Sequence, residues 1–366
     1  MRLAITSSVL VLIGFLAVVE QPAQALAQGK PAALSSASLS DIQQRAEAGD
    51  AQAQFEFGRA YEDGKGLPQD DAKAVEWFRK SAEQGNAQAE NSLGVMYALG
   101  RGITRDREEA VRWYKKAAKQ GSAEGLYNVA ISYYNGEGVD ASMSKACTWM
   151  MAAQRKGDKQ AEEALKHIQQ EISSRFDRCK FDLAALYEKG DEFEQDLPAA
   201  VALYMEAAQQ EHKQNLFADS AQYKMCQLYI AGKGVPQDYA QAKTWCKKSE
   251  VPFAYVVLGR MAERGLGQEK NTQEALEFYR DAAILGVPDG YMDSGRLRLQ
   301  SGSHERMKDA YFWYGIAARY KFSGAADKLN EVAALLNEKE VAEASKQVAD
   351  WLKMPSPKRT AELKKH

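Results

Sequence analysis

Apolar side chains recur along most of this chain at spacings of three and four residues, in short segments divided by glycine-containing loops. In residues 87–121, Leu93 and Met96 would lie on one face of a helix, and Trp113 and Ala117 would share a face of a second helix after the loop. Such spacing is typical of amphipathic helices that bury one side. The pattern therefore predicts pairs of short helices that pack against each other.

The same pattern occurs three times with equal spacing, in residues 51–86, 87–122 and 123–158. Tyrosine, glycine, alanine and tryptophan each return at a fixed place in the three segments. The matched residues are Tyr61, Tyr97 and Tyr133; Gly64, Gly100 and Gly136; Gly66, Gly102 and Gly138; Ala74, Ala110 and Ala146; Trp77, Trp113 and Trp149; and Gly85, Gly121 and Gly157. Three aligned tryptophans among the 6 in the chain indicate internal repetition.

Each segment has the sequence of a helical hairpin. Gly100 and Gly102 are expected to end the first helix, because glycine adopts left-handed backbone conformations at little cost. Gly94, inside that helix, would let the paired helix approach closely. Asp106 lies where the second helix should begin and can accept hydrogen bonds from its free N–H groups. Gly121 then turns the chain into the next segment.

The motif Leu-Gly-x-x-Tyr-x-x-Gly-x-Gly, followed by Asp and then by Ala-x-x-Trp-Tyr/Phe-x-x-Ala-Ala-x-x-Gly, resembles the Sel1-like repeat, a relative of the tetratricopeptide repeat. Residues 93–121 carry this motif almost completely. Further copies around Tyr187, Tyr229, Gly259 and Trp313 extend the resemblance over about residues 45–325. The resemblance implies an all-α fold, an α/α superhelix (solenoid) of stacked antiparallel helix pairs. Members of that family act mostly as adaptors and assembly scaffolds.

Two stretches do not fit the hairpin pattern. Residues 159–175 and 325–352 each predict a single helix with one apolar side, as expected of the caps that cover an exposed end of a solenoid. We therefore predict two sub-arrays, each closed by such a helix. The predicted divisions are a signal peptide at 1–27, a Pro/Ser/Ala linker at 28–39, one sub-array at 40–174, a second with its C-terminal cap at 175–352, and a basic tail at 353–366. We expect the linker and the tail to be mobile.

The N-terminus has the features of a secretory signal peptide. Arg2 precedes an apolar run at 3–19, and small residues follow at Ala23, Ala25 and Ala27. Cleavage is predicted after Ala27 or Ala25. The alternative is an uncleaved membrane anchor, for which the run is near the lower length limit. Cleavage would place the chain in the bacterial periplasm or the secreted space, without stable membrane insertion.

The four cysteines are Cys147, Cys179, Cys226 and Cys246, and in an exported protein an even number suggests disulfides. Cys226 and Cys246 lie on the two helices of one predicted hairpin, roughly opposite each other. In the cysteine-rich secreted branch of the Sel1-like family, a disulfide also joins the two helices of each repeat. The cysteines of this chain are displaced from those positions by about one turn in each helix. Cys147 and Cys179 begin helices near one end of the stack. We predict the disulfides Cys226–Cys246 and Cys147–Cys179; the alternative is buried free thiols.

Composition and motifs give no support for catalysis. A net charge of -2, from 48 basic and 50 acidic residues, provides no strong field that would select nucleic acid or an anionic membrane. The 4 histidines lack a metal-ligand spacing, and the chain has no nucleophile elbow, phosphate-binding loop or dinucleotide fingerprint. We predict no catalytic residue, no cofactor, no metal site and no nucleic-acid partner.

The first helices of stacked pairs line a concave face, which is the usual binding surface of solenoids. Positions on these helices that vary between repeats, against a fixed framework, are candidates for specificity. They are Phe55, Arg59, Asn91, Tyr127, Asn128, Phe181, Tyr223, Lys224, Arg260 and Arg296. The aromatic members would suit an interface hot spot. Alternatively, they pack on the second helix of the preceding repeat.

The sequence therefore predicts a non-catalytic scaffold or adaptor that binds another protein, such as an envelope, signalling or host protein. Two alternatives remain open. One is a hydrolase or binder that acts on a β-lactam or on peptidoglycan, and the other is an assembly factor for cell-surface polysaccharide. The sequence does not predict the oligomeric state.

Overall fold

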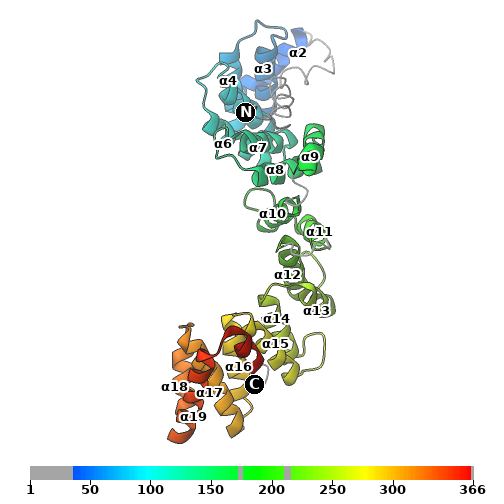
Figure 1. Ribbon diagram of the computed structural model, residues 1–366. Helices are drawn as coiled ribbons and strands as arrows, with labels where there is room; N and C mark the ends of the chain where they lie inside the picture. Colours follow the sequence, from blue (N-terminus) through cyan, green and yellow to red (C-terminus); the bar gives the residue numbers. More distant parts are fainter. Residues whose placement is uncertain (1–35, 172–175, 210–215, 364–366) are drawn as a thin grey trace, which may run out of the picture. The chain divides into compact units, whose positions relative to one another are not determined.

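The computed structural model describes residues 36–171, 176–209 and 216–363. Every regular element in this part of the chain is a helix (Figure 1). The helices are α2 (Ser36–Glu47), α3 (Ala51–Asp63), α4 (Asp71–Glu83), α5 (Ala87–Leu99), α6 (Arg107–Lys119), α7 (Ala123–Asn135), α8 (Met143–Arg155), α9 (Lys159–Glu171), α10 (Phe176–Lys189), α11 (Leu197–Ala208), α12 (Leu216–Ala231), α13 (Tyr239–Lys248), α14 (Phe253–Arg264), α15 (Thr272–Ile284), α16 (Pro288–Leu299), α17 (His304–Arg319), α18 (Ala325–Ala333), α19 (Glu338–Lys353) and α20 (Ser356–Leu363).

Consecutive helices pack in pairs, as the hairpin pattern predicts. The pairs α3/α4, α7/α8, α10/α11, α12/α13, α14/α15 and α16/α17 each form a hairpin, and α11 packs against α12 and α15 against α16 to stack one hairpin on the next. This arrangement confirms the all-α solenoid of antiparallel helix pairs.

The predicted helix boundaries have the expected chemistry. The side chain of Asn86 accepts a hydrogen bond from the backbone N–H of Ala89 at the start of α5, and Gly100 ends that helix in a left-handed conformation with φ 71°. At the start of the second helix of a hairpin, Asp106 accepts from the N–H of Glu109 at 2.9 Å. These caps satisfy backbone groups that a short helix otherwise leaves without partners.

Close approach of paired helices depends on small residues in the first helix. A Cβ atom at Gly58 would lie 2.7 Å from the ring of Phe78, and one at Gly259 would lie 2.5 Å from the ring of Tyr279. Both glycines stand where Gly94 stands in its own repeat. The close approach that the sequence predicts at Gly94 is thus found at these two equivalent positions, where an aromatic ring of the second helix covers the glycine.

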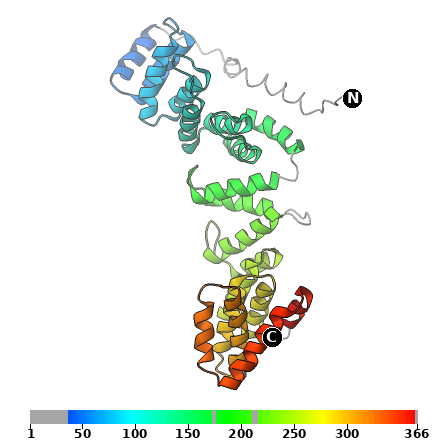
Figure 2. The same cartoon turned by 60° about the vertical axis from the view of Figure 1, so that its left-hand side comes forward.

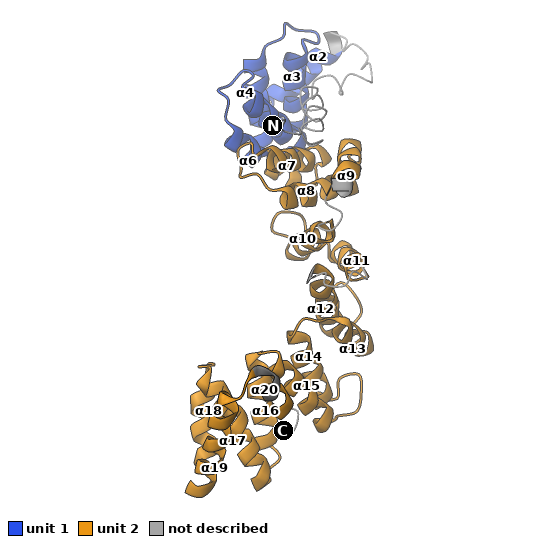
Figure 3. Cartoon of the chain, viewed as in Figure 1, with its two compact units in different colours: residues 1–113 blue, residues 114–366 orange. Residues whose placement is uncertain are grey.

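The chain divides into two compact units, residues 1–113 and 114–366 (Figure 3). The described part of unit 1 buries Phe57, Phe78, Leu93 and Met96 between its helices. Unit 2 contains the remaining hairpins and α18 to α20. The predicted border between sub-arrays, at 174/175, lies outside the described residues, as do the predicted signal peptide and most of the linker, so these divisions stay predictions.

The middle of helix α8 is buried, because α7, α9 and α10 all pack against this helix. Every residue from Ala146 to Ala153 is buried. Helix α9 is the single helix that the sequence predicts, and its Ala161 and Leu165 stand in the same register as Ala89 and Leu93 of α5. It therefore resembles the first helix of a hairpin that lacks its second helix.

The prediction of one continuous helix over 325–352 is wrong. The chain forms two helices there, α18 and α19, and both pack against α17. Asn337 accepts a hydrogen bond from the N–H of Glu340, whose side chain accepts one from the N–H of Asn337. This capping box starts a new helix and explains the break.

The prediction of mobile segments at both ends is also wrong where the structure describes them. Residues 356–363 of the predicted tail form α20, at the red end of the chain (Figures 1 and 2). Leu363 of this helix is buried against the last hairpins. Arg359 donates to the carbonyl oxygens of Leu352 and Met354 at 2.6 and 2.7 Å, which holds α20 at the end of α19. At the other end, residues 36–39 of the predicted linker form the first turn of α2, where Leu39 is buried.

Among the helices that the structure describes, none combines the length and the apolar character needed to cross a membrane. The apolar run at 3–19 lies outside the described residues.

Candidate partner-binding groove

Helices α10 and α12 are the first helices of two successive hairpins in unit 2 (Figure 1). A groove with a volume of ≈ 530 Å³ lies between them. Its walls include Phe181 and Glu188 of α10, Tyr204 of α11, Tyr223 and Lys224 of α12, and Lys233 of the loop after α12. Phe181, Tyr223 and Lys224 belong to the set that the sequence predicts for partner binding. The structure therefore brings part of that set together on neighbouring first helices, where the solenoid argument expects a binding surface.

Aromatic rings form one wall of the groove. The ring of Phe181 contacts that of Tyr204 edge to face, with 5.3 Å between centroids, and lies 6.4 Å from that of Phe217. Tyr223 is half-buried on the opposite helix. Phe181 thus packs within its own hairpin and against α12 while one part of it still lines the groove. These aromatic contacts of Phe181 are with the second helix of its own hairpin and with α12, whereas the sequence led us to expect packing on the second helix of the preceding repeat. Its role in partner binding stays a prediction.

A carboxylate at the groove wall, that of Glu188, has three partners. Its Oε2 accepts from Lys224 Nζ at 2.9 Å and from the Tyr204 hydroxyl at 3.0 Å, and its Oε1 lies 3.4 Å from Lys233 Nζ. Only 13 % of the Glu188 side chain is exposed, whereas 44 % of the Lys233 side chain is. Two ammonium groups from different parts of the chain therefore converge on one partly buried carboxylate.

These contacts fix the protonation states in the groove. Burial alone would raise the pKa of Glu188, but the hydrogen bond and charge of Lys224 together lower that pKa below its usual value. Burial, with the nearby Glu188 charge, raises the pKa of Tyr204 well above its usual range. At neutral pH the carboxylate is therefore ionised and the hydroxyl is protonated.

The pair of tyrosine and glutamate recurs in a later hairpin. The hydroxyl of Tyr279 donates to Glu263 Oε2 at 2.6 Å, and Arg296 of the next first helix donates to both oxygens of Glu263, at 2.8 and 2.7 Å. Arg260 reaches Asp293 in the same way, at 3.0 Å. Arg296 and Arg260, both predicted for partner binding, thus form ion pairs that join α14 to α16, and they lie outside the groove.

The other predicted residues lie elsewhere in their units. Phe55 and Arg59 belong to unit 1, where the Phe55 ring lies 5.8 Å from that of Phe78 and Arg59 pairs with Asp63 at 3.4 Å. Asn91, Tyr127 and Asn128 are half-buried on α5 and α7. Burial raises the pKa of Tyr127 to about 12. A role for these residues in partner binding stays a prediction.

Sequence reasoning missed Glu188, Tyr204 and Lys233. A comparison of repeats would have found the first two, because Glu263 and Tyr279 occupy the same places in a later hairpin. Lys233 stands where Arg101 stands in an earlier repeat, and Arg101 pairs with Glu62 at 3.2 Å in unit 1. The variable positions of the first helices do not include this carboxylate, which recurs together with its cation.

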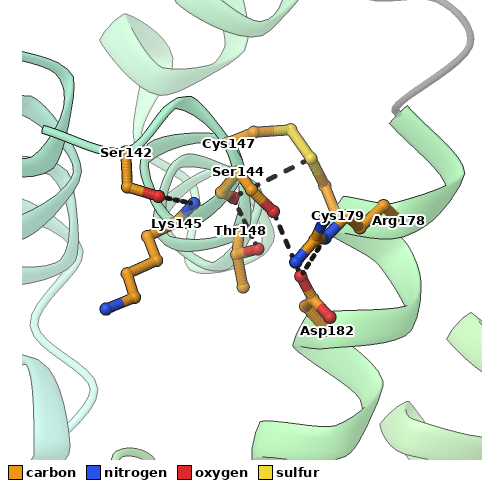
Figure 4. Close-up of a disulfide and its surroundings, with 8 residues drawn as sticks. All are labelled: Ser142, Ser144, Lys145, Cys147, Thr148, Arg178, Cys179 and Asp182. Atoms are coloured by element: carbon orange, nitrogen blue, oxygen red, sulfur yellow. Dashed lines mark hydrogen bonds and ion pairs between the residues drawn. A yellow bond between two sulfur atoms is a disulfide. The ribbon is translucent and has the colours of Figure 1, made fainter.

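All four cysteines are paired, as predicted. Cys147 of α8 is bonded to Cys179 of α10, with 5.9 Å between Cα atoms (Figure 4). Cys226 of α12 is bonded to Cys246 of α13, with 5.2 Å between Cα atoms. Beside the first disulfide, Ser144 Oγ donates to Asp182 Oδ2 at 3.1 Å (Figure 4).

In the described residues, no group of three or more histidine, cysteine, aspartate or glutamate side chains is placed to hold a metal ion. His304 is the first residue of α17 and lies 2.6 Å from Glu340 Oε1.

A family model described as "Sel1 repeat" matches this chain at residues 51–86, 87–122, 123–158, 178–212, 219–249 and 252–287. These segments make up more than half of the 366 residues. The hairpin of α16 and α17, which the sequence analysis counted as a further copy, lies outside the matched segments.

Several solved structures are similar to this chain. A protective antigen of uropathogenic Escherichia coli displaying an SLR fold has 22% sequence identity and a TM-score of 0.31, and the match covers 89% of this chain and 97% of that chain. A Sel1 repeat protein from Oxalobacter formigenes has 23% identity and a TM-score of 0.38, with coverages of 81% and 80%. A putative Sel1 repeat protein from Klebsiella pneumoniae has 20% identity and a TM-score of 0.26, with coverages of 71% and 98%.

Proposed function

Because the chain belongs to the Sel1 repeat family, we propose that it is a non-catalytic scaffold that binds another protein through the groove between α10 and α12. The observation that carries this proposal is the convergence of Phe181, Tyr223 and Lys224 on that groove. Aromatic rings supply large contact area at low entropic cost, and a cation beside them adds orientation. Such a combination suits a protein interface.

The protonation states in the groove support binding rather than catalysis. A general acid or base works best when its pKa lies near the working pH. The pKa of Glu188 is lowered, and that of Tyr204 is raised, so each is held away from neutrality. Both groups are therefore suited to fixed hydrogen bonds and charge contacts.

Export to the periplasm or the secreted space is the second part of the proposal. Two disulfides support it, because such bonds persist in oxidising compartments and are rare in the bacterial cytosol. The apolar run at 3–19, followed by small residues, supplies the predicted signal peptide. Mass spectrometry of the mature N-terminus in fractionated cells tests this part, and an uncleaved chain retained in the cytosol would contradict it.

Affinity capture from envelope extract, with residues 28–366 as bait and mass spectrometry as readout, tests the binding proposal. We expect one saturable protein partner, whose capture falls at least tenfold in Tyr223→Ala, about the loss of one interface hot spot. Tyr320→Ala is the matched control, because Tyr320 is an exposed tyrosine of unit 2 outside the groove. Turnover of a β-lactam or a muropeptide by the purified chain, without a protein partner, would overturn the proposal.

A further inference from the structure

We propose that the groove between α10 and α12 recognises a short acidic segment of the partner protein, and that Glu188 competes with this segment for the two lysines. This inference rests on the proposed binding function and adds to it the chemistry of the partner. It also gives Glu188 a role, because the internal carboxylate sets how strongly the groove attracts an external one.

The charge of the groove differs from that of the chain as a whole. Its lining includes three lysines, Lys189, Lys224 and Lys233, and one carboxylate, Glu188. Over the whole sequence the acidic residues outnumber the basic ones, 50 to 48. The groove is therefore a locally cationic surface, and an acidic ligand is its electrostatic complement.

The lysines have hydrogen-bonding capacity beyond Glu188. An ammonium group carries three N–H donors, and the contact with Glu188 uses one donor of Lys224 and one of Lys233. Lys233 is also the more exposed of the two, with 44 % of its side chain exposed against 29 % for Lys224. A carboxylate that enters the groove would find both ammonium groups already held near each other.

The aromatic residues place limits on the rest of the ligand. Phe181 and Tyr223 line the same groove as the lysines, on opposite helices. An apolar side chain next to the acidic ones would bury its surface between these rings. The expected ligand is thus an acidic peptide with an aromatic or aliphatic residue among its carboxylates, and not a free inorganic anion.

Fluorescence anisotropy with labelled synthetic peptides tests this inference on the oxidised chain, residues 28–366. The acidic probe contains two phenylalanines among glutamates, and two matched probes carry glutamine or lysine in place of glutamate. We expect the acidic probe to bind most tightly, and its affinity to fall with rising salt because exposed charge contacts are screened. Sodium alginate as competitor distinguishes an acidic polysaccharide, and preferential binding of alginate would overturn the proposal.

Variants give the sharper test, because competition predicts effects of opposite sign. Glu188→Gln keeps an acceptor for the Tyr204 hydroxyl and releases the lysines, so it should tighten binding of the acidic probe by about two- to fivefold. Lys233→Gln should weaken binding by about the same factor. Lys346→Gln, at an exposed lysine of α19, is the control and should change nothing.

The outcomes also separate this inference from the proposed function. Weaker acidic binding in Glu188→Gln, or a preference for the lysine probe, would overturn the acidic ligand and the competition. If a captured protein partner is still lost in Tyr223→Ala, the groove remains a protein interface with a different ligand. If no probe and no protein binds, both proposals fail.

Discussion

The two disulfides join helices that stand in different relations to each other. Cys226 and Cys246 link the two helices of one hairpin, at the places that Gly58 and Phe78 occupy in the first repeat. There a glycine and an aromatic ring already bring two helices together, with the ring packed over the glycine. The disulfide thus replaces one form of close contact between the two helices of a hairpin by another.

Cys147 and Cys179 link helices of different hairpins, with α9 between them in sequence. Cys179 stands in the same place as Gly125 of an earlier repeat. A Cβ at Gly125 would lie 2.9 Å from Ala117, near the end of the preceding second helix. Cys179 instead meets Cys147 in the first half of α8 (Figure 4). Helix α10 therefore packs on α8 in a register that the regular repeats do not use.

The Cys226–Cys246 bond reinforces a contact that packing already makes in other repeats, whereas the Cys147–Cys179 bond holds a contact that the repeat does not provide. The chain-entropy model does not separate them strongly. With sequence separations of 32 and 20, the loss of unfolded-chain entropy stabilises the folded chain by about 3.7 kcal/mol for Cys147–Cys179 and about 3.3 kcal/mol for Cys226–Cys246. Any larger difference in stabilisation between the two disulfides must come from the packing around each bond.

The largest effect is expected when the junction bond is removed. Cys147→Ala/Cys179→Ala should lower the free energy of local opening at α10 by about 4 kcal/mol, because the loop constraint is lost where regular stacking is absent. Hydrogen exchange followed by mass spectrometry, with peptides from α8 and α10, measures this. Cys226→Ala/Cys246→Ala, followed at α12 and α13, is the comparison variant. An equal or larger loss of opening free energy at α12 and α13 in this comparison variant would contradict the distinction between the two bonds.

The next largest effect is expected from variants in which residues found at the same places in other repeats replace the cysteines. Cys226→Gly/Cys246→Phe restores the pair seen at Gly58 and Phe78, and it should be about 1–2 kcal/mol more stable than the double alanine variant, because the ring fills the space over the glycine. Phenylalanine is preferred to tyrosine here, because Ile230 stands where Glu263 accepts the Tyr279 hydroxyl. Urea unfolding followed by circular dichroism measures the difference.

The matching change at the junction should give no such rescue. Val111 and Ala89 occupy the places of Cys147 and Cys179 in an earlier repeat, so Cys147→Val/Cys179→Ala restores the framework residues there. Because α10 does not use the framework register on α8, this variant should be no more stable than the double alanine variant, within about 0.5 kcal/mol. Recovery of stability would mean that regular stacking is available to α10 after all.

The sequence predicts the features that depend on local or repeated contacts. Hairpins, caps such as Asp106 and the Cys226–Cys246 bond all follow from residues within one repeat. It does not predict the packing register of α10, because two helices can meet in several registers with similar apolar faces. Nor does it predict α20, whose place depends on Arg359 reaching the carbonyl oxygens at the end of α19. The groove falls between these cases: the sequence names Phe181, Tyr223 and Lys224 of its lining, but not the carboxylate of Glu188 or the ion pairs that it forms.

The smallest effect concerns the start of α9, the helix that separates the two junction cysteines in sequence. Asp158 accepts from the N–H of Ala161 at 2.8 Å, and Asp238 similarly caps α13 in the hairpin of the other disulfide, accepting from Ala240 and Gln241 at 2.9 Å each. Asp158→Ala and Asp238→Ala should each cost about 1 kcal/mol, the usual value of a helix cap. With both disulfides intact, we expect increased exchange in α9 from the first variant and in α13 from the second.

The cap of α9 also has a pH dependence of its own. Burial raises the pKa of Asp158, although the N–H groups of Ala161 and Gln160 oppose the shift. A carboxyl whose pKa is higher in the folded state binds its proton more tightly there, so the native chain loses stability as pH rises through that pKa. Asp158→Asn keeps the acceptor without the charge. Its stability relative to the native chain should therefore increase from acidic to neutral pH, by less than about 1 kcal/mol for this partly exposed group. Urea unfolding of both proteins across this pH range measures the change. If the stability of Asp158→Asn relative to the native chain falls as pH rises, folding lowers the pKa of Asp158 instead of raising it, and the prediction is wrong.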